Sequence, residues 1–306
     1  MNNLLKSAID FYQNKQFVEA EKICQNILDL DSNNFDAINL LAAISFQNKS
    51  FSKSIELFKK ACKINPNKAD LYNNLSIAYM QEKNFKEAIW SWDEATKLKP
   101  NFFQAYFGKG NAYSDLKDYS NAINNFKKAI EINKNYKEAY NNLGTLYANP
   151  KDYKNALIIF KKAVLIKPVH FNEFNNLGNV YYELNKYKDS IENYNLAIKI
   201  NPDFALTYYN KAKALQKVNF IEESIINYEK AISLNKNFSE AYQNLGNIYM
   251  DLKILDKSIY NHKKALKINP GIKFLLGTII QSKYGMCDWD NFEYESKFLE
   301  KEILGG

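Results

Sequence analysis

The sequence predicts an all-α solenoid, because small residues and prolines recur along it with a period of 34 residues. One column of small residues consists of Ala61, Ala95, Ala129, Ala163, Ala197, Ala231 and Ala265. A second column consists of Ala20, Ser54, Ala88, Ala122, Ala156, Ser190, Ser224 and Ser258. The prolines Pro66, Pro100, Pro168, Pro202 and Pro270 keep the same phase. A fixed period of this length indicates stacked helical pairs, in which each repeat buries its apolar surface against its neighbours.

The period divides most of the chain into eight helix-turn-helix repeats. We place them at 1–34, 35–68, 69–102, 103–136, 137–170, 171–204, 205–238 and 239–272. In each repeat we expect two antiparallel helices, with the proline near the end stopping the second helix because proline cannot continue one. Small residues on the facing sides let the two helix backbones approach closely.

The motif within a repeat identifies the family that these repeats resemble. The third repeat reads Leu-Tyr-Asn-Asn-Leu-Ser-Ile-Ala-Tyr over 71–79, followed by Ala88, Trp92, Ala95 and Pro100. This pattern resembles the tetratricopeptide repeat (TPR), and the resemblance extends over all but the last 34 residues. It implies a right-handed superhelix whose first helices line a concave groove that holds a protein or an extended peptide.

The composition excludes several other classes of protein. The chain has 41 basic and 34 acidic residues and a formal charge of +7, and every basic residue is lysine. Without arginine, bidentate recognition of phosphates and bases is disfavoured, so we expect no nucleic-acid partner. Cys24, Cys62 and Cys287 show neither disulfide nor metal-ligand spacing, and no apolar run is long enough to span a membrane. We therefore expect a cytoplasmic protein without a cofactor, a metal or a membrane partner, and its oligomeric state stays open.

Asparagines recur on the predicted first helices and form the candidate binding site. One column consists of Asn74, Asn142, Asn176, Asn210 and Asn244, and a second, three residues further on, of Asn111, Asn179 and Asn247. Residues three apart share one face of a helix, and asparagine is a poor residue for a helix interior. Because a side-chain amide both donates and accepts hydrogen bonds, this ladder is suited to the backbone of an extended peptide. The alternative is that some of these residues reflect the abundance of asparagine in the chain.

Two other kinds of site are disfavoured. A carboxylate clamp of the kind that grips chaperone C-termini needs lysine or arginine near the asparagines. The residues just before the first column are instead Asn39, Asn73, Asn141, Asn175 and Gln243. A catalytic site is also disfavoured, because there is no phosphate-binding loop and no nucleophile motif. His262 takes the position of Phe58, Trp92, Phe126, Phe160, Tyr194 and Tyr228, and we expect it to pack in their place.

The segment 273–306 is expected to form a C-terminal helical cap. A helix is predicted over 272–284, with Leu275, Leu276, Ile279 and Ile280 covering the eighth repeat, and a second from about 290 to 304. The sequence Cys287-Asp288-Trp289 resembles the segment that joins TPR repeats to the catalytic region in O-linked N-acetylglucosamine transferases of the SPINDLY type. In that family the catalytic residues lie downstream, so the resemblance assigns none to this chain.

Two functions follow as expectations. The first is that the chain is the N-terminal substrate-recognition region of a SPINDLY-like protein glycosyltransferase, shown here without its catalytic domain. The alternative is a complete non-enzymatic scaffold that mediates protein–protein interaction. Binding of single-stranded RNA is the weakest possibility.

Overall fold

The computed structural model describes residues 2–272 and 275–286, and in this part of the chain it has seventeen α-helices and no strand. The predicted all-α class is confirmed. The chain divides into two compact units, 1–150 and 151–306, and each is described by itself.

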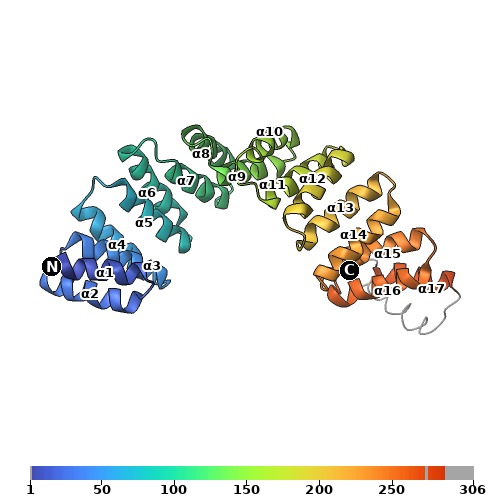
Figure 1. Ribbon diagram of the computed structural model, residues 1–306, viewed down its shortest axis with the longest axis horizontal. Helices are drawn as coiled ribbons and strands as arrows, with labels where there is room; N and C mark the ends of the chain where they lie inside the picture. Colours follow the sequence, from blue (N-terminus) through green and yellow to red (C-terminus); the bar gives the residue numbers. More distant parts are fainter. Residues whose placement is uncertain (1, 273–274, 287–306) are drawn as a thin grey trace, which may run out of the picture. The chain divides into compact units, whose positions relative to one another are not determined.

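The first unit stacks nine helices in chain order (Figure 1). They are α1 (Asn2–Gln13), α2 (Phe17–Leu30), α3 (Phe35–Gln47), α4 (Phe51–Ile64), α5 (Ala69–Gln81), α6 (Phe85–Leu98), α7 (Phe103–Asp115), α8 (Tyr119–Ile132) and α9 (Lys137–Ala148). Each helix packs on the next one along the chain, so the buried residues form neighbouring clusters and not one central core.

The second unit continues in the same way, from α10 to α17. Its helices are α10 (Tyr153–Ala163), α11 (Phe171–Glu183), α12 (Tyr187–Ile200), α13 (Ala205–Lys217), α14 (Ile221–Leu234), α15 (Ser239–Asp251), α16 (Leu255–Ile268) and α17 (Leu275–Gly285). The last of these packs on α16 and buries Leu275 and Ile279. Leu276 and Ile280 are only half-buried. The second predicted C-terminal helix and the Cys287-Asp288-Trp289 segment lie outside the described residues.

The small residues hold the two helices of a pair at close range. A Cβ atom on Gly178 of α11 would lie 2.5 Å from Cε1 of Tyr194 in α12, so only glycine fits beneath this ring. In the same pair, Ser190 Oγ donates a hydrogen bond to the carbonyl of Gly178 over 2.8 Å. Ser190 therefore joins these paired helices as well as leaving room for them.

The turn inside each repeat places a non-glycine residue in the left-handed region. These residues have φ between 58° and 65° and lie 34 residues apart: Lys15, Lys49, Lys83, Lys117, Lys151, Asn185, Asn219 and Lys253. At one of them, the N–H of Lys117 donates to the carbonyl of Ser114, and the next N–H, of Asp118, donates to that of Tyr113. This is a Schellman cap, whose left-handed residue is most often glycine. The sequence gives no sign of it, because lysine is an unusual choice there.

Candidate asparagine-lined binding site

The eight predicted asparagines all lie on odd-numbered helices and are all partly exposed. In the first unit Asn74 lies in α5, Asn111 in α7 and Asn142 in α9. In the second unit α11 carries Asn176 and Asn179, α13 carries Asn210, and α15 carries Asn244 and Asn247. Each amide therefore lies at the boundary between the packed interior and the surface. There one of its atoms can bond to the protein while the other bonds to a ligand.

In the first unit two of these asparagines bond to each other. Asn142 Nδ2 donates to Asn111 Oδ1 over 2.8 Å, joining α9 to α7 across 31 residues of sequence. An amide side chain can make up to four hydrogen bonds, so this contact leaves most of the capacity of both groups for other partners. The pair also fixes the orientation of both side chains.

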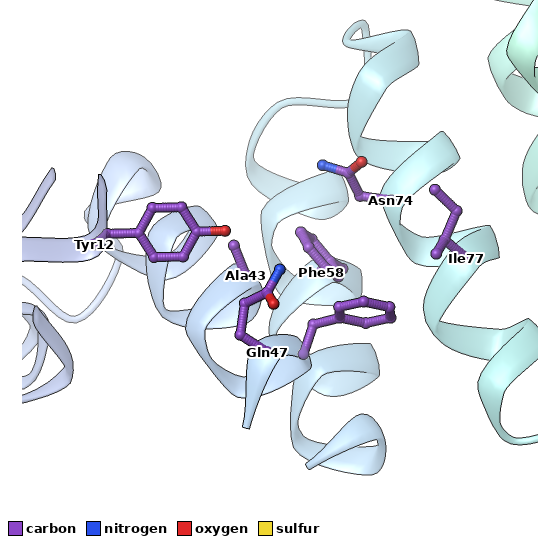
Figure 2. Close-up of a pocket in the computed structure, with 7 residues that line it drawn as sticks. Tyr12, Ala43, Gln47, Phe58, Asn74 and Ile77 are labelled. Carbon is purple, nitrogen blue, oxygen red and sulfur yellow. The ribbon is translucent and has the colours of Figure 1, made fainter. Parts of the chain in front are cut away.

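Asn74 lies in a different setting in the first unit. It lines a cavity of about 210 Å³ together with Tyr12, Ala43, Phe46, Gln47, Phe58 and Ile77 (Figure 2). The cavity combines two amides, Asn74 and Gln47, with aromatic rings and an aliphatic side chain. Such a surface can accept an apolar side chain while the amides hold the adjacent backbone.

The second unit repeats the asparagine pair and surrounds it with a polar cavity. Asn210 Nδ2 donates to Asn179 Oδ1 over 3.1 Å, and the hydroxyl of Tyr194 donates to the same oxygen over 2.8 Å. A cavity of about 290 Å³ adjoins these groups and is also lined by Tyr182, Glu183 and Lys213. Burial raises the pKa of the Tyr194 hydroxyl, so this group stays a neutral donor.

Lys213 is a site residue that the sequence analysis missed. It lies in α13 beside Asn179 and Asn210, with Nζ 4.9 Å from the ring centroid of Tyr182 and 5.7 Å from that of Tyr209. It occupies the seventh-repeat position of the second asparagine column, so the 34-residue register could have found it. The second unit thus has a cation beside its paired amides.

The last two predicted asparagines contact aromatic residues that are partly or fully buried. Asn244 Nδ2 donates to the hydroxyls of Tyr209 and Tyr228 over 3.2 and 3.3 Å. Asn247 Oδ1 lies 3.0 Å from Nε2 of His262, whose side chain is fully buried in α16. These two amides therefore bond to the packed interior while remaining partly exposed at the surface. Asn176 of α11 is partly exposed as well.

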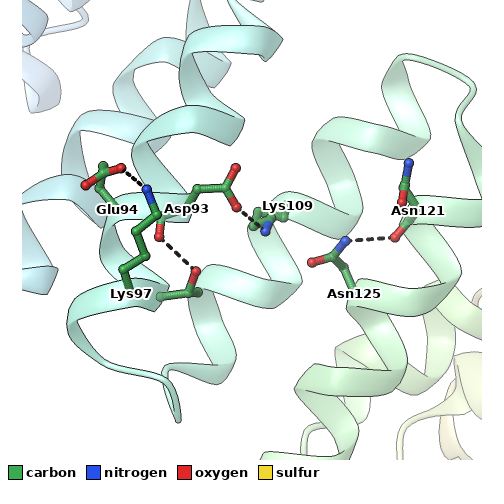
Figure 3. A network of polar contacts seen from close by, with 7 residues as sticks. Asp93, Glu94, Lys97, Lys109, Asn121 and Asn125 are labelled. Atoms are coloured by element: carbon green, nitrogen blue, oxygen red, sulfur yellow. Dashed lines mark hydrogen bonds and ion pairs between the residues drawn. The ribbon is translucent and has the colours of Figure 1, made fainter.

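A second lysine lies next to a predicted site residue in the first unit. Lys109 precedes Gly110 and Asn111 in α7 and pairs with Asp93 of α6, in a network that also contains the Lys97–Glu94 pair (Figure 3). Its side chain is only 12% exposed, and it takes the position that leucine holds in five other repeats: Leu41, Leu75, Leu143, Leu177 and Leu245. The carboxylate of Asp93 compensates a charge that would otherwise be costly there.

The groups of the candidate site are suited to binding a ligand through hydrogen bonds and charge. The site offers amide donors and acceptors, tyrosine hydroxyls and the ammonium group of Lys213. Within residues 2–272 and 275–286, no three His, Cys, Asp or Glu side chains are grouped so as to hold a metal ion. No described helix has both the length and the apolar character that crossing a bilayer requires.

Family models of one repeat type match most of the chain. A model described as a TPR repeat matches residues 42–82, 77–117, 110–149 and 178–219. Models described as tetratricopeptide repeat match 137–170 and 205–238, and also 227–260. No curated protein matched the chain.

Solved TPR structures have the same fold. The C-terminal part of a TPR repeat-containing protein from Cytophaga hutchinsonii is 18% identical, with a TM-score of 0.67, and the match covers 77% of this chain and 97% of that one. YrrB, a TPR protein with an unusual peptide-binding site, is 20% identical with a TM-score of 0.53, covering 61% of this chain and 96% of that one. MamA is 25% identical with a TM-score of 0.50, and the match covers 53% of this chain and 94% of MamA.

The repeat motif, the stacked helical pairs and the matched segments, which together span well over half of the sequence, agree with one another. The chain belongs to the tetratricopeptide-repeat family.

Proposed function

We propose that each unit of this protein binds an extended segment of a partner protein on its odd-numbered helices, and that the asparagine amides hold the main chain of that segment. The observation that carries the proposal is the recurrence of a bonded asparagine pair, Asn111–Asn142 in the first unit and Asn179–Asn210 in the second. Each pair presents amides in a fixed orientation, which lowers the entropy that a ligand must overcome. The peptide-binding site named for the similar protein YrrB supports the same class of function.

The neighbouring groups add preferences for side chains. Beside Asn74, the cavity with Phe46, Phe58 and Ile77 favours an apolar side chain. Beside Asn179 and Asn210, Lys213 favours a carboxylate or a backbone carbonyl. Backbone capture by amides carries little sequence preference, so we expect these flanking cavities to set the choice of partner.

A binding experiment tests the role of the amides. A peptide selected from a display library of unstructured sequences would be labelled with a fluorophore and titrated against the wild type and N142A/N210A. Removing two amides that bond the ligand is expected to weaken binding by about tenfold or more. The matched control is N124A/N195A, which removes two exposed asparagines from the even-numbered helices. Equal affinity for the wild type and N142A/N210A would refute the proposal.

We further propose that the partner is a substrate of a SPINDLY-like protein O-linked N-acetylglucosamine transferase, whose recognition region this chain would form. The asparagine columns followed by Cys287-Asp288-Trp289, in that order along the chain, support this assignment. The alternative is a non-enzymatic TPR scaffold, and for both we expect the cytoplasm. Intact mass measurement of the native protein separates them. A species far above 35.6 kDa that carries this sequence and a sugar-nucleotide-binding domain supports the transferase, and one of 35.6 kDa supports the scaffold.

A further inference from the structure

The second unit has further cavities, which are separate from the one beside Asn179 and Asn210. Two cavities of about 380 and 610 Å³ adjoin each other, because both are lined by Lys236 and Tyr242. Their walls come from α14, α15, α16 and the loop between α14 and α15. We call this surface the outer groove, and define it by Lys236, Tyr242, Lys257, Tyr260, Lys264 and Lys267.

The outer groove is strongly basic. All four of its lysines are exposed. Among the described residues that line the two cavities, Glu229 is the one carboxylate, and its Oε1 accepts a hydrogen bond from the hydroxyl of Tyr249 over 3.3 Å. The groove therefore carries an excess of positive charge that a carboxylate-bearing ligand would balance.

The same groove has an apolar and aromatic floor. Only 8% of the surface of Tyr242 is exposed, and Ile232 and Leu245 line the smaller cavity beside it. Tyr260 stands at the rim with 58% of its surface exposed, and Lys264 Nζ lies 5.5 Å from its ring centroid. A ligand that combined acidic with aromatic or aliphatic side chains would use both the charges and the floor.

Two lysines at equivalent positions in the first unit pair with oxygen atoms of the chain itself. In the first unit, Lys60 lies at the position equivalent to Lys264, and its Nζ donates to the carbonyl of Ser32. Lys53 lies at the position equivalent to Lys257 and pairs with Glu21 at 2.7 Å. Lys236 takes the place of the proline that ends most repeats. The lysines of the outer groove thus differ from Lys53 and Lys60 in that no carboxylate or carbonyl of the described residues pairs with their ammonium groups, and Lys236 adds a charge that most repeats lack at its position.

We propose that the outer groove is a second docking surface, which binds an acidic segment of a partner protein. Its carboxylates pair with Lys236, Lys264 and Lys267, and an apolar side chain of the segment packs on Tyr242 and Tyr260. This surface is independent of the asparagine site, so a partner could be held at both. A nucleic acid is the less suitable ligand, because its bases and phosphates would leave the aliphatic floor unmatched and the chain lacks arginine.

A titration tests this assignment on the full chain. The probe is a fluorescein-labelled peptide of about a dozen residues in which glutamate and aspartate alternate with phenylalanine and leucine. The variant K264E/K267E is expected to weaken binding by about tenfold or more, because two attractions become repulsions. Y260A is expected to weaken it several-fold, and added salt should reduce the affinity of the wild type.

Matched variants decide between the outcomes. K60E/K63E makes the same change of charge at the equivalent positions of α4, and it should leave binding unchanged. An equal loss in K60E/K63E would mean attraction to the overall charge and would overturn the proposal, as would unchanged binding in K264E/K267E that retains its helical content. Tighter binding of single-stranded oligothymidylate of equal charge would also overturn it. Retained binding in N142A/N210A would show independence from the asparagine site.

Discussion

The hydroxyl of Tyr194 in α12 donates a hydrogen bond to Asn179 Oδ1 in α11, across 2.8 Å. His262 in α16 has the same relation to Asn247 in α15, with Nε2 3.0 Å from Oδ1. In each pair an aromatic ring at the same repeat position supports an asparagine of the second column from inside the molecule. The candidate site is therefore held in place by the packed interior.

The stability of the second unit should depend on pH through His262. Burial lowers the pKa of this imidazole below its usual value near 6.5, so the unfolded chain takes up the proton first on acidification. The contribution of His262 is fully present above about pH 6.5 and declines as the pH falls below it. Urea unfolding at about pH 7.5 and about pH 5.5 should show a larger loss in the wild type than in H262Y, which keeps an aromatic hydroxyl toward Asn247. An identical loss in both proteins would contradict this account.

Glycine at the left-handed positions should stabilise the protein. K117G and K253G relieve a backbone conformation that costs an L-residue about 1 kcal/mol, and each should raise the free energy of unfolding by about 0.5–1 kcal/mol. The control is K263G, at an exposed position inside α16, which should lower it by about 1 kcal/mol. Thermal denaturation followed by circular dichroism measures both effects, and destabilisation by K117G would count against the left-handed assignment.

Removing Asp93 should lower the stability of the protein more than replacing Lys109 by leucine does. D93A leaves a mostly buried ammonium without its carboxylate and should cost about 1–2 kcal/mol, because Asp93 is itself 43% exposed. K109L introduces the leucine that five other repeats carry and should be close to neutral. Chemical denaturation of the two variants gives the comparison. A larger cost for K109L than for D93A would show that the pair itself stabilises the fold.

Removing the hydroxyl of Ser190 should loosen the pairing of α11 with α12. S190A leaves the buried carbonyl of Gly178 without this donor and should cost about 1 kcal/mol. S120A, at an exposed position at the start of α8, serves as the control and should change stability little. Hydrogen exchange of the α11 and α12 amides should rise in S190A, and unchanged exchange would argue against a role in pairing.

The helices could be predicted because their signals are local and repeat. The proline near the end of a repeat and the small residues at facing positions predict the order of the helices from sequence alone. The placing of the asparagines on the odd-numbered helices followed from the same register.

The contacts between repeats could not be predicted in this way. Whether Asn142 reaches Asn111 depends on the rotation from one helical pair to the next, which the period does not specify. Lys213 was missed because it replaces an asparagine at one position of the column, and only the structure places it over Tyr182. The left-handed lysines were missed because their preference for that conformation is set by the turn and not by the residue.

The bonded amides have a consequence for the energetics of association. If a ligand carbonyl binds here as proposed and takes the hydrogen that Asn210 shares with Asn179, Oδ1 of Asn179 still has the hydroxyl of Tyr194 and can also accept an N–H from the ligand. One internal hydrogen bond is thereby exchanged for two external ones, and no polar atom loses its last partner at any stage. Under the proposed function, a polypeptide would therefore bind and dissociate without leaving these amide groups unpaired.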